Sequence, residues 1–352
     1  MLARKQAHLE TRGSSLIVCF EQVPSVAIQA PIGPGSDVPA EINGYRIVPT
    51  ELTCKYQKEL LVEGNAKELL ARLQNWKAEV FVSPWDGKSS SLTGATVHVL
   101  TVGVEKYPKG SGFDPLPYAE TSSKAVEDFF NKKEHNAQKG GVQVRVWSGL
   151  YDGEATREAI RGRFAEMAKA MKEDDVVIIY LAGHGVVPQG QEMFYFVPVD
   201  GKNEDIRTTA LSTAMLAEAL RNMPARRILL MIDACQSGGA VEALSKIGEV
   251  KVRVEEQHMK LEDRQSPATE SGVGVHIIAA TLPLSYATGP KAGKSPMALT
   301  LLQALNGTTA MSVKATVDYF NKELPDASEK MAHFRQVPMT SSIGVDFPLT
   351  PK

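Results

Sequence analysis

The sequence predicts an α/β protein in which helices cover both faces of a mostly parallel sheet. Three observations support this prediction. From about residue 95 onward, short β-branched or apolar runs alternate with segments whose apolar residues have helical spacing. The composition, 43% hydrophobic and 23% charged, is that of an ordinary globular protein, and 352 residues can bury a large core. Strands that alternate with helices in this way form parallel sheets.

Five segments have the composition of buried strands. The first is a β-branched run, and the second alternates Val142, Val144 and Val146 with other residues. The later segments are nearly continuous in apolar side chains, as expected for a sheet covered on both faces. In chain order the expected strands are 96–104, 142–146, 175–181, 227–232 and 274–280.

Five further segments are predicted to be helices. The clearest is the second, in which Ile160, Phe164, Met167 and Met171 recur on one face. In chain order the expected helices are 122–130, 157–172, 211–221, 296–305 and 313–324.

The region before this pattern, residues 1–91, is predicted to be a small accessory domain or pro-domain. Residues 14–23 fit one strand, and residues 24–49 are rich in proline and glycine. Residues 66–76 have the composition of a helix with one apolar face. The sequence assigns no function to this region.

The charge and the cysteine content exclude several classes of protein. A formal net charge of −2 offers no basic surface to a phosphate backbone, so we expect no nucleic-acid partner. Three cysteines, at positions 19, 54 and 235, cannot form a disulfide framework. The first residues lack the apolar core of a secretory signal, and the apolar runs are too short to cross a membrane. We therefore expect a cytoplasmic protein without a membrane partner.

Residues 244–272 interrupt the strand–helix pattern with many charges and few large apolar side chains. This composition predicts an exposed loop that divides a large part, residues 95–243, from a small part, residues 273–352. Two interpretations stay open: a solvated loop, or an activation linker that is cut after a basic residue. The candidate processing residues are Lys246, Lys251, Arg253, Lys260 and Arg264.

Two of the predicted strands run directly into reactive residues. One is followed by Gly183-His184-Gly185 and the other by Asp233-Ala-Cys-Gln-Ser-Gly238, and Cys235 comes 51 residues after His184. In an open α/β sheet, reactive groups gather at the carboxyl ends of the strands. A histidine within hydrogen-bond reach of a cysteine stabilises the thiolate, which is the nucleophile. The pattern therefore predicts a Cys–His dyad.

With these motifs the chain resembles the caspase-like cysteine peptidases, whose histidine stands about 50 residues before the cysteine. The aspartate two residues before Cys235 is more similar to the metacaspase version of the motif. The resemblance runs from about residue 95 to 349 and includes Tyr107 and Phe196-Val-Pro-Val-Asp200. It implies a caspase-like three-layer sandwich and cysteine endopeptidase activity.

Carried over position by position, the resemblance implies that Cys235 is the nucleophile and His184 the general acid and base. The backbone N–H groups of Gly185 and Cys235 would form the oxyanion hole. Asp233 matches the acidic floor of the S1 pocket, which implies cleavage after Arg or Lys.

Two positions depart from the metacaspase pattern. Ala182 stands where a serine usually precedes the histidine by two residues, and Ser122 stands where a second acidic pocket residue is expected. Asp233 is then the one pocket acid that this chain retains. The calcium-site carboxylates of metacaspases have no clear match, so we expect no cofactor or metal and leave calcium dependence open.

The leading hypothesis is a cysteine endopeptidase that is made as a zymogen and activated by cleavage within residues 244–272. Its partners would be protein or peptide substrates and an upstream activating protease or signalling complex. The alternative is a catalytically silent caspase-like scaffold that binds partners through residues 1–91. The intact pair of His184 and Cys235 argues against the alternative.

Overall fold

The computed structural model describes two kinds of region. Side chains are described for residues 92, 94–132, 142–188, 193–241, 243–254, 272–281, 293–306, 312–332 and 336–350. Nine strands between residues 3 and 89, and a helix that continues to residue 262, are described as backbone.

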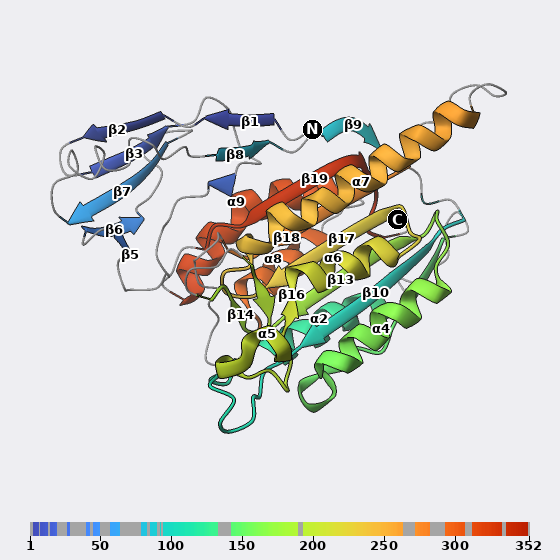
Figure 1. Cartoon of the computed structure of the whole chain (residues 1–352), viewed down its shortest axis with the longest axis horizontal. Helices are drawn as coiled ribbons and strands as arrows, with labels where there is room; N and C mark the ends of the chain where they lie inside the picture. The colour runs from blue at the N-terminus through green and yellow to red at the C-terminus, as the bar shows by residue number, and fades with distance from the viewer. Residues whose placement is uncertain are drawn as a thin grey trace.

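The centre of the molecule is a mostly parallel sheet (Figure 1). The strand order is β11-β10-β13-β17-β18-β19-β9, and the short β12 also pairs with β10. All neighbours are parallel except β18 and β19, which are antiparallel. The strands are β9 (Trp85–Ser89), β10 (Thr96–Gly103), β11 (Gln143–Val146), β12 (Leu150–Tyr151), β13 (Val176–Ala182), β17 (Arg227–Asp233), β18 (Gly274–Ala279) and β19 (Met339–Asp346).

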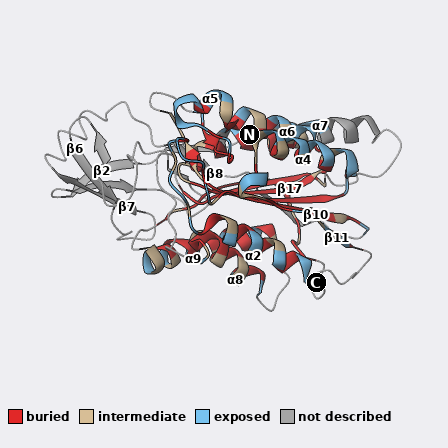
Figure 2. Ribbon diagram, turned by 90° about the horizontal axis from the view of Figure 1, so that it is seen from below, coloured by how far each residue is buried: buried red, intermediate tan, exposed pale blue. Residues whose placement is uncertain are grey.

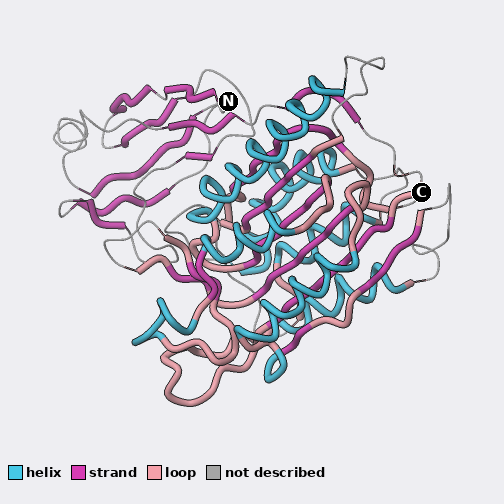
Figure 3. The backbone as a smooth tube through the Cα atoms, turned by 45° about the vertical axis from the view of Figure 1, so that its right-hand side comes forward, coloured by secondary structure: helices cyan, strands magenta, loops and turns pink. Residues whose placement is uncertain are grey.

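The helices form one layer on each face of this sheet, so the predicted three-layer architecture is confirmed (Figure 2). Helices α4, α6 and α7 cover one face, and α2, α8 and α9 cover the other. Figure 3 shows the helices lying along the strands. Their bounds are α2 (Ala119–Asn131), α4 (Arg157–Ala170), α6 (Thr213–Asn222), α7 (Gly238–Glu262), α8 (Pro296–Leu305) and α9 (Val313–Ala332).

Two apolar cores lie between the sheet and the helices, one on each face of the sheet. Every residue of β13 and β17 is buried, which explains why these strands lack polar alternation in the sequence. Side chains that alternate along β13 divide between the two cores: Ile179 belongs to one and Ile178 to the other. This placement fixes the central strands, whose carboxyl ends carry the reactive residues.

Side-chain caps begin four of the described helices. Thr156, Ser212, Ser295 and Ser312 each accept a hydrogen bond from the backbone N–H three residues later, at the start of α4, α6, α8 and α9. Such caps satisfy N–H groups that have no partner inside the helix. The five predicted helices and five predicted strands are confirmed within a few residues, although α9 continues through Pro325 to Ala332. Leu324 and Pro325 are both buried, and this packing offsets the lost backbone hydrogen bond.

The prediction of a loop over residues 244–272 is wrong for residues 244–262, which belong to helix α7. Val241, Leu244 and Ile247 are 2%, 0% and 3% exposed, so one face of the helix packs into the core. These apolar residues, at spacings of three, determine the helix despite the surrounding charges. Residues 263–271 lie outside the described residues.

The connection between β13 and α6 carries small elements that the sequence pattern did not predict. Strands β14 (Gly185–Val186), β15 (Tyr195–Phe196) and β16 (Leu211–Ser212) form a small antiparallel sheet after His184. A short helix, α5 (Ile206–Thr209), lies between β15 and β16. The antiparallel pairing places the chain after His184 against β15.

The accessory region contains two small antiparallel sheets, with orders β1-β8-β4 and β2-β3-β7-β6-β5. The strand expected over residues 14–23 is present as β3, while the helix expected over 66–76 lies outside the described residues. The remaining strands are β1 (Ala3–Gln6), β2 (His8–Arg12), β3 (Ser15–Cys19), β4 (Ala27–Ile28), β5 (Ala40–Ile42), β6 (Tyr45–Pro49), β7 (Gln57–Glu63) and β8 (Glu79–Val82). The next strand, β9, pairs with β19 at one edge of the main sheet.

Candidate active site

The loops that carry His184 and Cys235 leave neighbouring parallel strands at the same level. In the register of β13 against β17, Ala182 lies opposite Asp233. His184 and Cys235 each follow these paired residues by two positions, so both emerge at the carboxyl edge of the sheet. The sequence predicted this arrangement from strand order alone.

Contacts between the two loops hold them together. Gly183 donates its backbone N–H to the Asp233 carbonyl at 3.3 Å, and Val187 donates its N–H to Oε1 of Gln236. A Cβ at Gly185 would overlap the Cys235 carbonyl oxygen and would lie 2.5 Å from a ring carbon of Phe194. Glycine at 185 is therefore required for the close approach of the two loops.

The ring of His184 is oriented by a backbone carbonyl. Its Nε2 lies 2.7 Å from the carbonyl oxygen of Asp114, a group that can only accept a hydrogen bond. Nε2 therefore carries the proton, and Nδ1 is the nitrogen left to exchange a proton with a thiol. Burial lowers the pKa of His184, while the hydrogen bond to Asp114 opposes this shift. Burial thus favours the neutral form of the ring.

Cys235 lies in a half-buried turn between β17 and α7. The next residue, Gln236, has a φ of 57°, which is an uncommon conformation for a residue other than glycine. Helix α7 begins three residues after the cysteine, and the positive end of a helix dipole favours a thiolate. The turn therefore places the sulfur at the carboxyl edge of the sheet with the helix N-terminus nearby.

Asp233 is fully buried beneath this edge. Its Oδ2 accepts hydrogen bonds from the Tyr180 hydroxyl at 2.5 Å and from the Ser295 hydroxyl. Its Oδ1 has no hydrogen-bond partner among the described residues. Burial raises the pKa of Asp233, and the two hydroxyl donors oppose the shift. The carboxyl group thus keeps one buried acceptor that a cationic side chain could use.

Ser295 connects Asp233 with two helices. Besides donating to Asp233, it caps α8 and donates its backbone N–H to the Ser122 hydroxyl at 2.8 Å. Ser122, which stands at the position of an expected pocket acid, is completely buried. The cluster also has a structural role, because it ties α2 and α8 to the end of β17.

The structure brings together four of the predicted site residues: His184, Gly185, Asp233 and Cys235. It adds the Asp114 carbonyl and Ser295, which sequence reasoning missed. A backbone carbonyl has no sequence signal. Ser295 could have been recognised from the Ser-Pro pair that begins a helix, but not its contact with Asp233.

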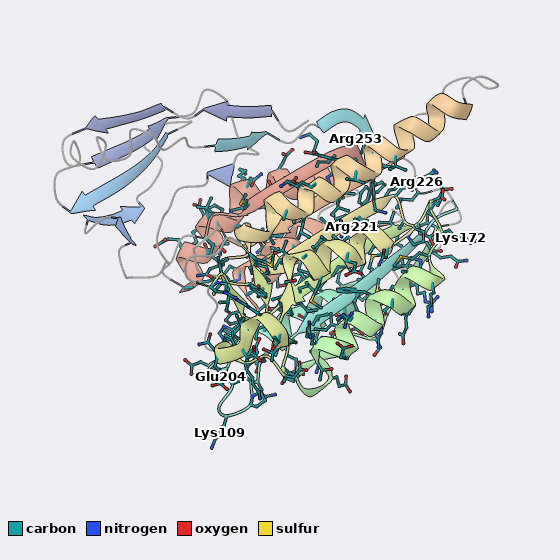
Figure 4. The ribbon with its side chains drawn as sticks, viewed as in Figure 1. Lys109, Lys172, Glu204, Arg221, Arg226 and Arg253 are labelled. Atoms are coloured by element: carbon teal, nitrogen blue, oxygen red, sulfur yellow. The ribbon has the colours of Figure 1, made fainter. Side chains whose placement is uncertain are left out.

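The candidate processing residues lie along and beyond α7. Lys246 and Arg253 are exposed on the helix, where Figure 4 labels Arg253. Lys251 is half-buried and donates from Nζ to the carbonyl oxygens of Met223 at 2.7 Å and Ala225 at 3.3 Å. Burial lowers the pKa of Lys251 to about 8. Two further candidates complete the set: Lys260, within the backbone of α7, and Arg264, outside the described residues.

Two other features bear on cofactors and membranes. Among the described residues, no group of three or more His, Cys, Asp and Glu side chains is placed to hold a metal ion. Within the same part of the chain, no helix combines the length and apolar character of a membrane span.

A three-layer α/β fold with histidine and cysteine at adjacent strand ends defines the class of caspase-like peptidases. The family model described as the caspase domain matches residues 96–348, and the chain belongs to this family. Among solved structures, the chain is similar to the crystal structure of protein GSU0716 from Geobacter sulfurreducens. The two are 17% identical, the match covers 71% of this chain and 94% of that one, and the TM-score is 0.46. A comparison with curated proteins gives no match.

Proposed function

We propose that this chain is an active cysteine endopeptidase in which Cys235 is the nucleophile and His184 the general acid and base. The observation that carries the proposal is the shared register of β13 and β17, which places the two residues on contacting loops. The orientation of His184 by the Asp114 carbonyl leaves Nδ1 for the proton exchange.

The chemistry proceeds in two stages on these groups. The Cys235 sulfur attacks the carbonyl carbon of the scissile bond, and the N–H groups of Gly185 and Cys235 stabilise the oxyanion. His184 carries the thiol proton to the departing amine, which leaves a thioester on Cys235. Water then attacks the thioester, and His184 takes the proton of the water and returns it to the sulfur.

The substrate preference is proposed from Asp233. A P1 lysine or arginine would supply the hydrogen-bond donor and the positive charge that its Oδ1 lacks among the described residues. An apolar or acidic P1 side chain would leave Oδ1 of this buried carboxyl group without a partner, which costs free energy.

Activation by cleavage within residues 244–272 remains part of the proposal. Residues 244–262 are helical. A protease can therefore cut after Lys246 or Arg253 only when α7 unwinds locally. The helix would thus slow processing and keep the precursor intact. An upstream protease or a signalling complex that binds α7 would accelerate cleavage.

The proposal is tested with fluorogenic peptides that carry Arg, Lys or Asp at P1, assayed with and without calcium. We expect Cys235→Ala to abolish turnover of the basic peptides, while intact-mass analysis locates any self-cleavage. Equal turnover by wild type and Cys235→Ala would refute the nucleophile. Absence of turnover in both the intact and the cleaved protein would favour a catalytically silent scaffold.

Asp233→Asn tests the specificity. Asparagine keeps the size of the side chain and can still accept hydrogen bonds from Tyr180 and Ser295. We expect kcat/KM for basic peptides to fall by about 100-fold, as when one partner of a buried charge pair is removed. Alkylation of Cys235 by iodoacetamide should continue at the wild-type rate. An unchanged preference for Arg and Lys would contradict the role of Asp233.

A further inference from the structure

Tyr107 lies directly beneath the loop of His184, with its hydroxyl in a closed set of hydrogen bonds. The His184 N–H donates to the Tyr107 hydroxyl at 3.0 Å, and this hydroxyl donates to the Val197 carbonyl at 3.1 Å. The Val197 N–H in turn donates to the His184 carbonyl at 2.9 Å. Both backbone polar groups of His184 are therefore bound within one ring of contacts.

The Tyr107 side chain also packs against the imidazole. Its ring centroid is 4.9 Å from that of His184, and Phe113 lies 5.1 Å from His184 and 5.6 Å from Tyr107. The three rings form a cluster in which each contacts the other two. The two aromatic faces restrict rotation of the imidazole, while the Asp114 carbonyl holds Nε2.

The hydroxyl of Tyr107 keeps its proton throughout the working range of the protein. The residue is 9% exposed, and burial raises the pKa of the hydroxyl further above its ordinary value. The titratable groups that act electrostatically on this cluster are Asp152 and Cys235, which raise the pKa of Tyr107, and Asp114, which raises that of His184. A donor that never ionises gives the loop a fixed anchor.

We propose that Tyr107 is a positioning residue of the dyad: its hydroxyl fixes the backbone of His184, and its ring fixes the imidazole plane that leaves Nδ1 for proton exchange with Cys235. This inference rests on the proposed function, because it assumes that His184 and Cys235 act together. In this role Tyr107 does not bind the substrate. It acts only through His184.

The test compares Tyr107→Phe with Tyr151→Phe, in a background where Cys19→Ser and Cys54→Ser leave Cys235 as the one thiol. Tyr107→Phe keeps the ring and deletes the hydroxyl. Tyr151 is a matched control, since its hydroxyl also makes two hydrogen bonds, to Thr101 and Glu127, and neither partner belongs to the dyad loops. Both variants should lose similar thermal stability.

The two variants should differ in their effect on the dyad. For Tyr107→Phe we expect kcat to fall about tenfold with KM unchanged, the loss expected from a hydrogen bond of ordinary strength. Without the hydroxyl the loop is looser, and water reaches His184. Because burial lowers the pKa of His184, the added water should raise that pKa toward its ordinary value. The acid limb of the pH profile for Cys235 alkylation should therefore move to higher pH. Tyr151→Phe should retain the wild-type kcat and the wild-type pH profile.

Three results would overturn the positioning role. These are an unchanged pH profile in Tyr107→Phe, a rise in KM without a fall in kcat, or the same changes in Tyr151→Phe. Failure of the proposed function is a separate result, because Cys235→Ala would then turn over peptides as well as the wild type. The pH profile of alkylation reads the dyad without any substrate.

Discussion

Substitution of Gly185 by alanine tests directly whether the two reactive loops contact each other. A Cβ at this position would overlap the Cys235 carbonyl and would lie 2.5 Å from the Phe194 ring and 3.0 Å from Cβ of Ala234. Ordinary contacts begin at 3.4 Å, so the loops must separate by about 1 Å. Overpacking of this kind costs about 1–3 kcal/mol of unfolding free energy. A displacement of about 1 Å at reacting groups reduces kcat/KM by about 100-fold.

The assay measures unfolding in urea together with peptide hydrolysis and Cys235 alkylation. Gly162→Ala is the matched control, because a Cβ there meets nothing within 4 Å in the middle of α4. It should raise stability by up to about 1 kcal/mol and leave activity unchanged. Wild-type stability together with wild-type activity in Gly185→Ala would refute the close approach of the two loops.

Two further predictions concern the buried titratable groups. His276 is completely buried, with Nε2 donating to the Val345 carbonyl at 2.9 Å, and burial lowers its pKa from 6.5 to about 4. The unfolded chain therefore binds more protons between these values, and stability should fall by roughly 3 kcal/mol as the pH drops from 6.5 to 4. Urea titrations at several pH values measure this slope, and an equal slope in His276→Gln would contradict the assignment. Lys251→Met should loosen α7, because it removes the donor to the Met223 and Ala225 carbonyls. Hydrogen exchange of α7 and cleavage after Arg253 should then both increase, whereas the exposed Lys246→Met should change neither; equal protection in both variants would refute the anchoring role.

The sequence predicted the central sheet well because its strands are buried on both faces. The run of β13 is apolar throughout, without amphipathic alternation. At seven residues it is too short for a buried helix, so a buried strand is the structure that it predicts. The closeness of the loops of His184 and Cys235 followed from the same pattern, since parallel neighbours place their carboxyl ends together. Residues 244–262 were wrongly predicted to be a loop because charged residues outnumber apolar ones there. Leu244 and Ile247, which are buried, nevertheless pack this part of α7 into the core.

Features that depend on distant pairing could not be predicted. The strand β19 contains Thr340, Ser341 and Ser342, which are buried and pair with β18, a strand more than 60 residues earlier in the chain. The Asp114 carbonyl reaches His184 across 70 residues of chain, and every residue carries such a carbonyl. The contact of Ser295 with Asp233 likewise joins residues 62 positions apart. Local composition contains no information about any of these contacts.

The pairing of β9 with β19 makes the accessory region part of the sheet that supports the active site. Any chain shortened to begin after residue 91 would leave β19 with a row of unsatisfied N–H and C=O groups along one side. Such an edge is a template for strand addition by another molecule. A partner that adds a strand to β19 must therefore displace β9, the strand that the protein itself supplies at this edge of the sheet.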